Sequence, residues 1–155
     1  MHRLVSSVLL ELLETPFASS ITYVNWGSAF STFFNLTAGV RKGGVFSPTL
    51  FAIYIDDVAK KVGACGSGCH LSLFSASMFC YANDILLIAS SVQSLQTLLH
   101  LCDIELIYLD MCINSKKFVC IRSVSRFDLK CSSITMLNGI ALDWVGVCRY
   151  LRIFL

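Results

Sequence analysis

Two short apolar runs, Met78–Tyr81 and Ile85–Ala89, are separated only by the polar tip Ala82-Asn83-Asp84. Two such runs joined by a short polar tip predict a β-hairpin. The alternative is a membrane-spanning helix, which needs about 20 mostly apolar residues. The best window, 71–90, places the polar tip at its centre, where an aspartate opposes insertion by about 2.5–3.5 kcal/mol. The sequence therefore predicts a hairpin and no membrane partner.

The composition is unusual for a self-contained soluble domain. Hydrophobic residues make up 55% of the 155 residues and charged residues only 14%, whereas an average soluble protein has about 25% charged residues. This composition excludes intrinsic disorder and leaves few charges to cover a surface. It fits a membrane protein or the interior part of a larger enzyme, and the hairpin favours the enzyme. The net charge of +2 is too small to indicate a nucleic-acid partner by itself.

Apolar spacing and turn residues predict the remaining elements. Apolar residues at helical spacing predict a helix over 4–13, and the Ser47-Pro48 start predicts another over 49–61. Ser90 or Ser91 opens an amphipathic helix over 92–107. Strands are predicted in 21–38 around the Asn25-Trp26-Gly27-Ser28 turn, at Phe118–Arg122, in a hairpin Ile134–Leu142 turning at Asn138-Gly139, and at Cys148–Leu155. The predicted fold is α+β, an antiparallel sheet with helices packed on one face.

The eight cysteines include no Cys-x-x-Cys pair. A disulfide scaffold is not expected without a secretory signal. Cys65, Cys69 and His70 are candidate metal ligands, but they lie in a Gly-Ser segment with no second pair at zinc-site spacing. A flexible loop is the favoured interpretation of this segment.

Six segments in order resemble the reverse transcriptase of non-LTR (LINE-type) retrotransposons. The resemblance runs from about residue 20 to the end of the chain. The six are Gly39–Pro48, similar to G-V-R-Q-G-G-V-L-S-P; Phe51–Val58, similar to F-x-I-Y-I-D-D-L; Tyr81–Asp84, similar to Y-A-D-D; the helix Ser94–Leu106; Asn114–Lys117, similar to N-x-x-K; and Arg149–Arg152, similar to K-Y-L-G. The resemblance implies that residues 1–155 are a partial reverse transcriptase domain, a partial polymerase palm without the fingers and the first palm strand.

The resemblance also implies an RNA-directed DNA polymerase site with two Mg²⁺ or Mn²⁺ ions. That family holds the ions with three aspartates, and only Asp84 has a counterpart here. Asn83, a neutral amide, stands at the first hairpin position, and residues 1–38 contain no Phe-x-x-x-Asp segment. Because divalent cations need hard anionic oxygens, one carboxylate should bind them weakly. We expect a catalytically inactive relative, which would need an N-terminal polymerase segment that this sequence lacks.

Individual roles follow from the resemblance alone. It implies a catalytic role for Asn83, Asp84 and Lys117, with Asp84 as metal ligand and Lys117 donating a proton to pyrophosphate. Tyr150 and Leu151 resemble a primer grip. Nucleotide or template contacts are implied for Gly39, Arg41, Lys42, Gly43, Gly44, Ser47, Pro48 and Tyr81. The implied partners are an RNA template, a DNA primer and dNTPs, in the nucleus or cytoplasm.

Three positions depart from the family pattern. Lys42 replaces the usual glutamine, Phe118 a small hydroxylated residue, and Arg152 a glycine. Tyr54-Ile55-Asp56-Asp57 matches Tyr-x-Asp-Asp better than the hairpin tip does, but it lies inside a predicted helix and is interpreted as an acidic pair on that helix. Two alternatives stay open: a non-catalytic RNA- or protein-binding module on a degenerate palm, and a small membrane protein.

Overall fold

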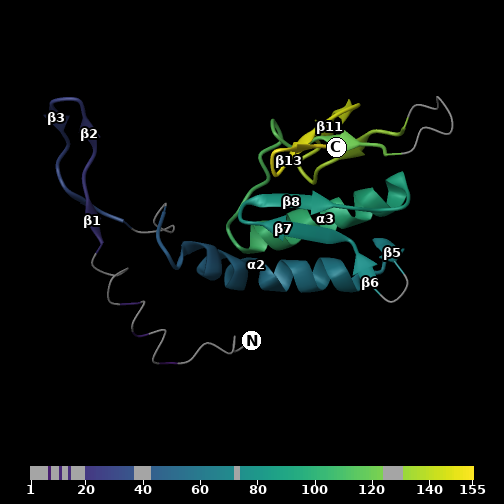
Figure 1. The fold of residues 1–155 in the computed structure, drawn as a ribbon, viewed down its shortest axis with the longest axis horizontal. Coiled ribbons are helices and arrows are strands. Elements are labelled where there is room, and N and C mark those ends of the chain that lie inside the picture. Colours follow the sequence, from purple (N-terminus) through teal and green to yellow (C-terminus); the bar gives the residue numbers. More distant parts are fainter. Residues whose placement is uncertain are drawn as a thin grey trace. The chain divides into compact units, whose positions relative to one another are not determined.

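The structure is a computed structural model that describes residues 7, 11, 14, 20–36, 43–71, 74–123 and 131–155 (Figure 1). The helix predicted over 4–13 lies almost wholly outside the described residues, as do Gly39, Arg41 and Lys42. The chain divides into two compact units, residues 1–47 and 48–155, which are described separately.

In the first unit, residues 21–35 form a narrow antiparallel ribbon. Strand β1 (Ile21–Thr22) pairs with β4 (Phe34–Asn35), and β2 (Asn25–Trp26) pairs with β3 (Ala29–Phe30). Gly27 has φ +62°, a left-handed conformation that glycine adopts without steric cost. The prediction of two strands around this turn is confirmed, although each strand is interrupted in its middle.

In the second unit, helices α2 (Ser47–Ala64) and α3 (Val92–Tyr108) form most of one core. Of the two serines that the sequence offers as the cap of α3, Ser91 takes the role, since its side chain accepts a 3.1 Å hydrogen bond from the Ser94 N–H. Lys61 of α2 forms a 2.6 Å ion pair with Glu105 of α3. Within the described residues, no helix has the length and apolar character needed to cross a membrane.

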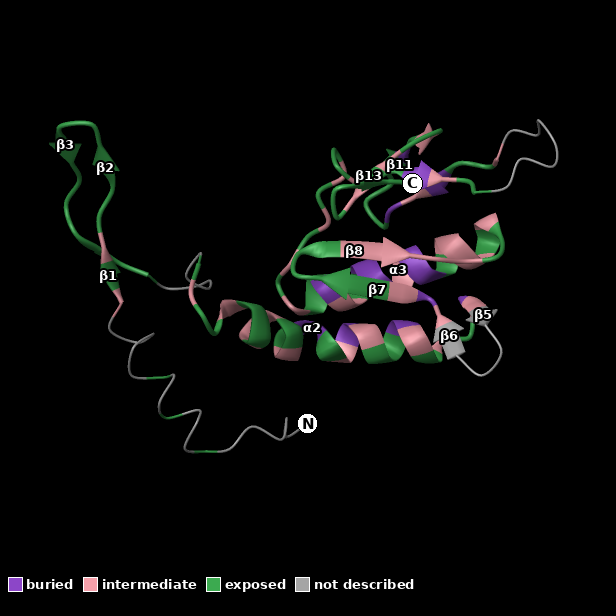
Figure 2. Cartoon of the chain, in the orientation of Figure 1, coloured by how far each residue is buried: buried purple, intermediate pink, exposed green. Residues whose placement is uncertain are grey.

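The predicted hairpin is present as β7 (Met78–Tyr81) and β8 (Asp84–Leu87). Met78, Ile85 and Leu87 pack against the core that α2 and α3 share, which confirms that both helices cover one face (Figure 1). The prediction that the two strands are central and buried is wrong. They form a two-stranded sheet, and β7 is largely exposed (Figure 2). Because no further described strand pairs with it, nothing described covers Phe79 and Tyr81, which are 49% and 66% exposed.

Three strand pairs follow α3. β9 (Cys120–Ile121) runs parallel to β12 (Trp144–Val145), and β10 (Ile134–Thr135) is antiparallel to β11 (Ala141–Leu142). The predicted hairpin that turns at Asn138-Gly139 is confirmed, but its loop is longer than a two-residue turn. The Met136 N–H donates to the Ile140 carbonyl at 2.9 Å, so that residues 137–139 form the loop.

The segment Cys148–Leu155 is not the single strand that the sequence predicts. It forms a hairpin of β13 (Arg149–Tyr150) and β14 (Ile153–Phe154). Leu151 and Arg152 both have positive φ and reverse the chain between the two strands.

The predicted Gly-Ser loop ends in a strand, because β5 (Cys69–Leu71) pairs with β6 (Phe74–Ala76). The eight cysteines form no disulfide. The described strands form seven two-stranded pairs, so the antiparallel sheet that was predicted is divided into small pieces. The described residues thus contain two long helices and small strand pairs, which confirms the α+β fold class.

Candidate functional site

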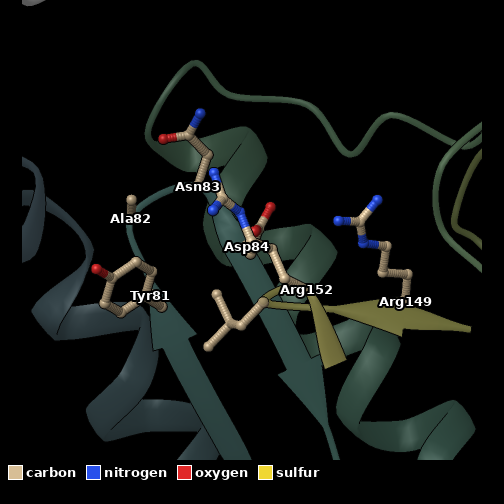
Figure 3. Close-up of a pocket in the computed structure, with 7 residues that line it drawn as sticks. Tyr81, Ala82, Asn83, Asp84, Arg149 and Arg152 are labelled. Carbon is tan, nitrogen blue, oxygen red and sulfur yellow. The ribbon is translucent and has the colours of Figure 1, made fainter. Parts of the chain in front are cut away.

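An open pocket of about 660 Å³ lies between the tip of the β7–β8 hairpin and the β13–β14 hairpin. Both hairpins belong to the second unit. The side chains that line the pocket are drawn in Figure 3; they are Tyr81, Ala82, Asn83, Asp84, Arg149, Leu151 and Arg152.

The β7–β8 tip is a two-residue turn, Ala82-Asn83, closed by the cross-strand pair of Tyr81 and Asp84. Ala82 has φ +49°, a conformation uncommon for residues other than glycine. Side chains alternate between the two faces of a strand, and Met78, Ile85 and Leu87 take the face toward the helices. Tyr81 and Asp84 therefore lie on the open face, and both are exposed.

The β13–β14 turn has Leu151 at φ +49° and Arg152 at φ +67°. Positive φ at both central residues is the signature of a type I′ turn, where asparagine and glycine are usual. The Arg152 side chain extends from this turn toward Asn83 and Asp84 (Figure 3). Arg149 Cζ lies 6.0 Å from the centre of the Phe154 ring, within reach of a cation–π contact.

The pocket is positive overall, because two arginines and one aspartate line it. Within the described residues, neither arginine forms an ion pair with Asp84 or with another carboxylate. Burial raises the pKa of the neighbouring Tyr150, and the negative charges of Cys80 and Asp84 raise this pKa further. Tyr150 stands between the pocket residues Arg149 and Leu151 in the chain.

A family model for the reverse transcriptase (RNA-dependent DNA polymerase) matches residues 5–142. The chain belongs to the reverse transcriptase family. No curated protein matches it. The match includes the β7–β8 tip and ends at Leu142, so it does not include the β13–β14 half of the pocket. The α+β fold is consistent with a partial polymerase palm.

This reverse transcriptase chain brings together four of the residues that the sequence singled out. Tyr81, Asn83, Asp84 and Leu151 line one pocket, and Tyr150 lies beside it. Lys117 is exposed and does not line the pocket. It lies in a turn, where its backbone N–H donates to the Asn114 carbonyl at 3.0 Å.

The Gly-rich loop residues that are described lead into α2. Gly43 has φ +77°, the Ser47 N–H donates to the Gly44 carbonyl at 3.1 Å, and Pro48 follows in the first turn of the helix. Gly39, Arg41 and Lys42 fall outside the described residues, so their predicted contacts stay predictions.

Sequence reasoning missed the two arginines as pocket residues. Arg149 was grouped with a primer-grip-like strand, and Arg152 was noted only as a poor replacement for glycine. No local sequence signal predicts their place, because Arg149 lies on the first strand and Arg152 in the turn of a hairpin that the sequence pattern does not predict.

The residues of this pocket do not fit the two divalent cations that reverse transcriptases use. Such ions need several anionic oxygens, whereas the pocket offers the Asp84 carboxylate, the Asn83 amide and two guanidinium groups that repel cations. The Asp56-Asp57 pair lies inside helix α2, as predicted, and Asp56 forms an ion pair with Lys60. Within the described residues, no group of three or more His, Cys, Asp or Glu side chains could hold a metal ion.

Proposed function

We propose that this chain is a palm fragment of a non-LTR (LINE-type) retrotransposon reverse transcriptase, and that it does not catalyse polymerisation by itself. The observation that carries the proposal is the hairpin tip, which presents one carboxylate beside one amide. Family membership supports the polymerase ancestry, and the order of the six similar segments supports the retrotransposon subtype.

The physical argument for inactivity concerns charge. A reverse transcriptase must concentrate negative charge at this tip so that two divalent ions exchange some of their water for protein oxygens. Asp84 supplies one negative charge, Asn83 supplies none, and Arg149 and Arg152 add two positive charges to the same pocket. The local field therefore opposes the binding of both ions.

Primer extension on a primed RNA template, with dNTPs and either Mg²⁺ or Mn²⁺, tests the proposal. We expect no templated product from the unmodified chain. Templated extension above a no-enzyme control would overturn the proposed inactivity.

Asn83→Asp supplies a second arm of the test. It doubles the carboxylates at the tip, so we expect tighter Mn²⁺ binding in a direct titration and still no extension. Asn138→Asp is the matched control because it adds the same charge to another exposed hairpin loop. If both variants bind Mn²⁺ equally, the tip has no special role in metal binding.

The proposed origin has its own test. Translation of the genomic DNA upstream of Met1 should reveal, in one of the three frames, a strand similar to F-x-x-x-D-x-x-x-A-F-D. Flanking DNA without any other reverse transcriptase segment would contradict a retrotransposon origin.

A further inference from the structure

We propose that the pocket between the β7–β8 tip and the β13–β14 turn binds a phosphate group without a metal ion. The proposal is independent of catalysis, because it concerns binding in the presence of a chelator. Its basis is the presence of Arg149 and Arg152 beside a tip that has a single carboxylate.

The arginines have the chemistry that a phosphate requires. A guanidinium carries a permanent positive charge and several N–H donors in a plane, which match phosphate oxygens in pairs. Arg149 has the Phe154 ring as its described contact, and Arg152 makes no ion pair within the described residues. Since the pocket is open, both groups are accessible to a ligand.

Asn83, like the two arginines, makes the charge at the tip less negative. A carboxylate at this position would repel a phosphate, whereas an amide is neutral and offers N–H donors. The Arg152 side chain extends toward Asn83 and Asp84 (Figure 3). A phosphate that contacts Arg152 would therefore meet the Asn83 amide on one side of the pocket.

The backbone of Arg152 supplies a separate observation. Its φ of +67° is a conformation in which a non-glycine residue is strained, at a cost of about 1–2 kcal/mol. Strained residues cluster at functional sites, where surrounding structure holds them in place. Glycine at this position would relieve the strain and also remove the guanidinium. A single substitution should therefore weaken phosphate binding without lowering the stability of the fold.

The test is a titration of the full chain with inorganic phosphate in the presence of EDTA, in which isothermal titration calorimetry measures the binding. We expect saturable binding that weakens as the salt concentration rises. Arg152→Gly should weaken it at least tenfold while the melting temperature rises or stays constant. The matched control is Arg122→Gly, because Arg122 is an exposed arginine at the end of β9 and does not line the pocket; it should bind phosphate as the unmodified chain does.

Further titrations identify the source of the phosphate. A nucleoside monophosphate that binds more tightly than inorganic phosphate would indicate a nucleotide, with the exposed Tyr81 ring available to stack on its base. Equal affinities would indicate that the phosphate alone is recognised. The proposal is overturned if phosphate binding is absent in EDTA, if it requires Mg²⁺, or if Arg152→Gly and Arg122→Gly weaken it equally.

Discussion

The backbone N–H of Leu137 donates a 3.1 Å hydrogen bond to the carboxylate of Asp103, a residue of α3 that is only 4% exposed. Two turns earlier on the same helix, the Gln96 side chain donates to the Thr135 carbonyl at 2.6 Å and accepts from the Thr135 N–H at 2.9 Å. Polar side chains on one face of α3 thus form hydrogen bonds with the backbone of Thr135 in β10 and of Leu137 in the loop that follows. These bonds join the β10–β11 hairpin to the helix.

Replacement of Asp103 by alanine should therefore lower the free energy of unfolding. The Leu137 N–H would lose its acceptor, and the hydrogen bond is partly buried because Asp103 is 4% exposed; loss of such a bond costs about 1–3 kcal/mol. Asp103→Asn keeps an acceptor oxygen and should cost less. Urea unfolding measures the three stabilities, with the exposed Asp143→Ala as control; an equal loss for Asp103→Ala and Asp143→Ala would contradict the role of the buried contact.

Gly68→Ala should destabilise the second unit through steric overlap. A Cβ at this position would lie 2.7 Å from the backbone Cα of Ser77, a residue that is 2% exposed. Overpacking of this kind costs about 1–3 kcal/mol because the backbone must shift. Gly63→Ala is the control in thermal unfolding, since its Cβ meets nothing within 4 Å and alanine favours a helix by up to about 1 kcal/mol. Equal melting temperatures for the two variants would refute the prediction.

Ala82→Gly should stabilise the β7–β8 hairpin. Ala82 has φ +49°, and glycine removes the steric penalty of about 1–2 kcal/mol while adding some entropy to the unfolded chain. We expect a net gain of about 0.5–1 kcal/mol. Ala141→Gly, at an exposed strand position with an ordinary backbone, should instead reduce stability. Chemical denaturation of both variants checks the opposite signs, and a loss at Ala82 would show that the turn is not strained.

The buried thiols should make the chain sensitive to alkali. Burial raises the pKa of Cys102 to about 12 and that of Cys120 to about 11, from an ordinary value of 9.0. A raised folded-state pKa contributes stability that is complete below pH 9 and is lost as the pH rises through the folded-state pKa. The free energy of unfolding should therefore fall between pH 9 and pH 12.

Urea unfolding at several alkaline pH values measures this loss. Cys102→Ala should flatten the pH dependence, because it removes one of the two thiols whose pKa burial raises. At pH 8, a thiol reagent should modify Cys112 quickly and Cys102 only after denaturant is added. Rapid modification of Cys102 in the native chain would contradict the burial of this thiol.

Local sequence signals determined the elements on which the site is built. The Ser91 cap and the 3.6-residue spacing of apolar side chains define α3, and two apolar runs around a polar tip define β7–β8, because these signals act within one or two turns of chain. The family resemblance rests on the same local segments, and the family match confirms it at the level of the reverse transcriptase.

Contacts between distant segments decided the rest. Nothing in the local sequence pairs β9 with β12, or predicts that Leu151 and Arg152 adopt left-handed conformations, since neither residue favours a tight turn. The exposure of Phe79 and Tyr81 likewise depends on which other strands pair with the hairpin. The sequence alone therefore determined the tip with Asn83 and Asp84, whereas only the tertiary structure placed Arg149 and Arg152 against it, because that approach depends on long-range packing.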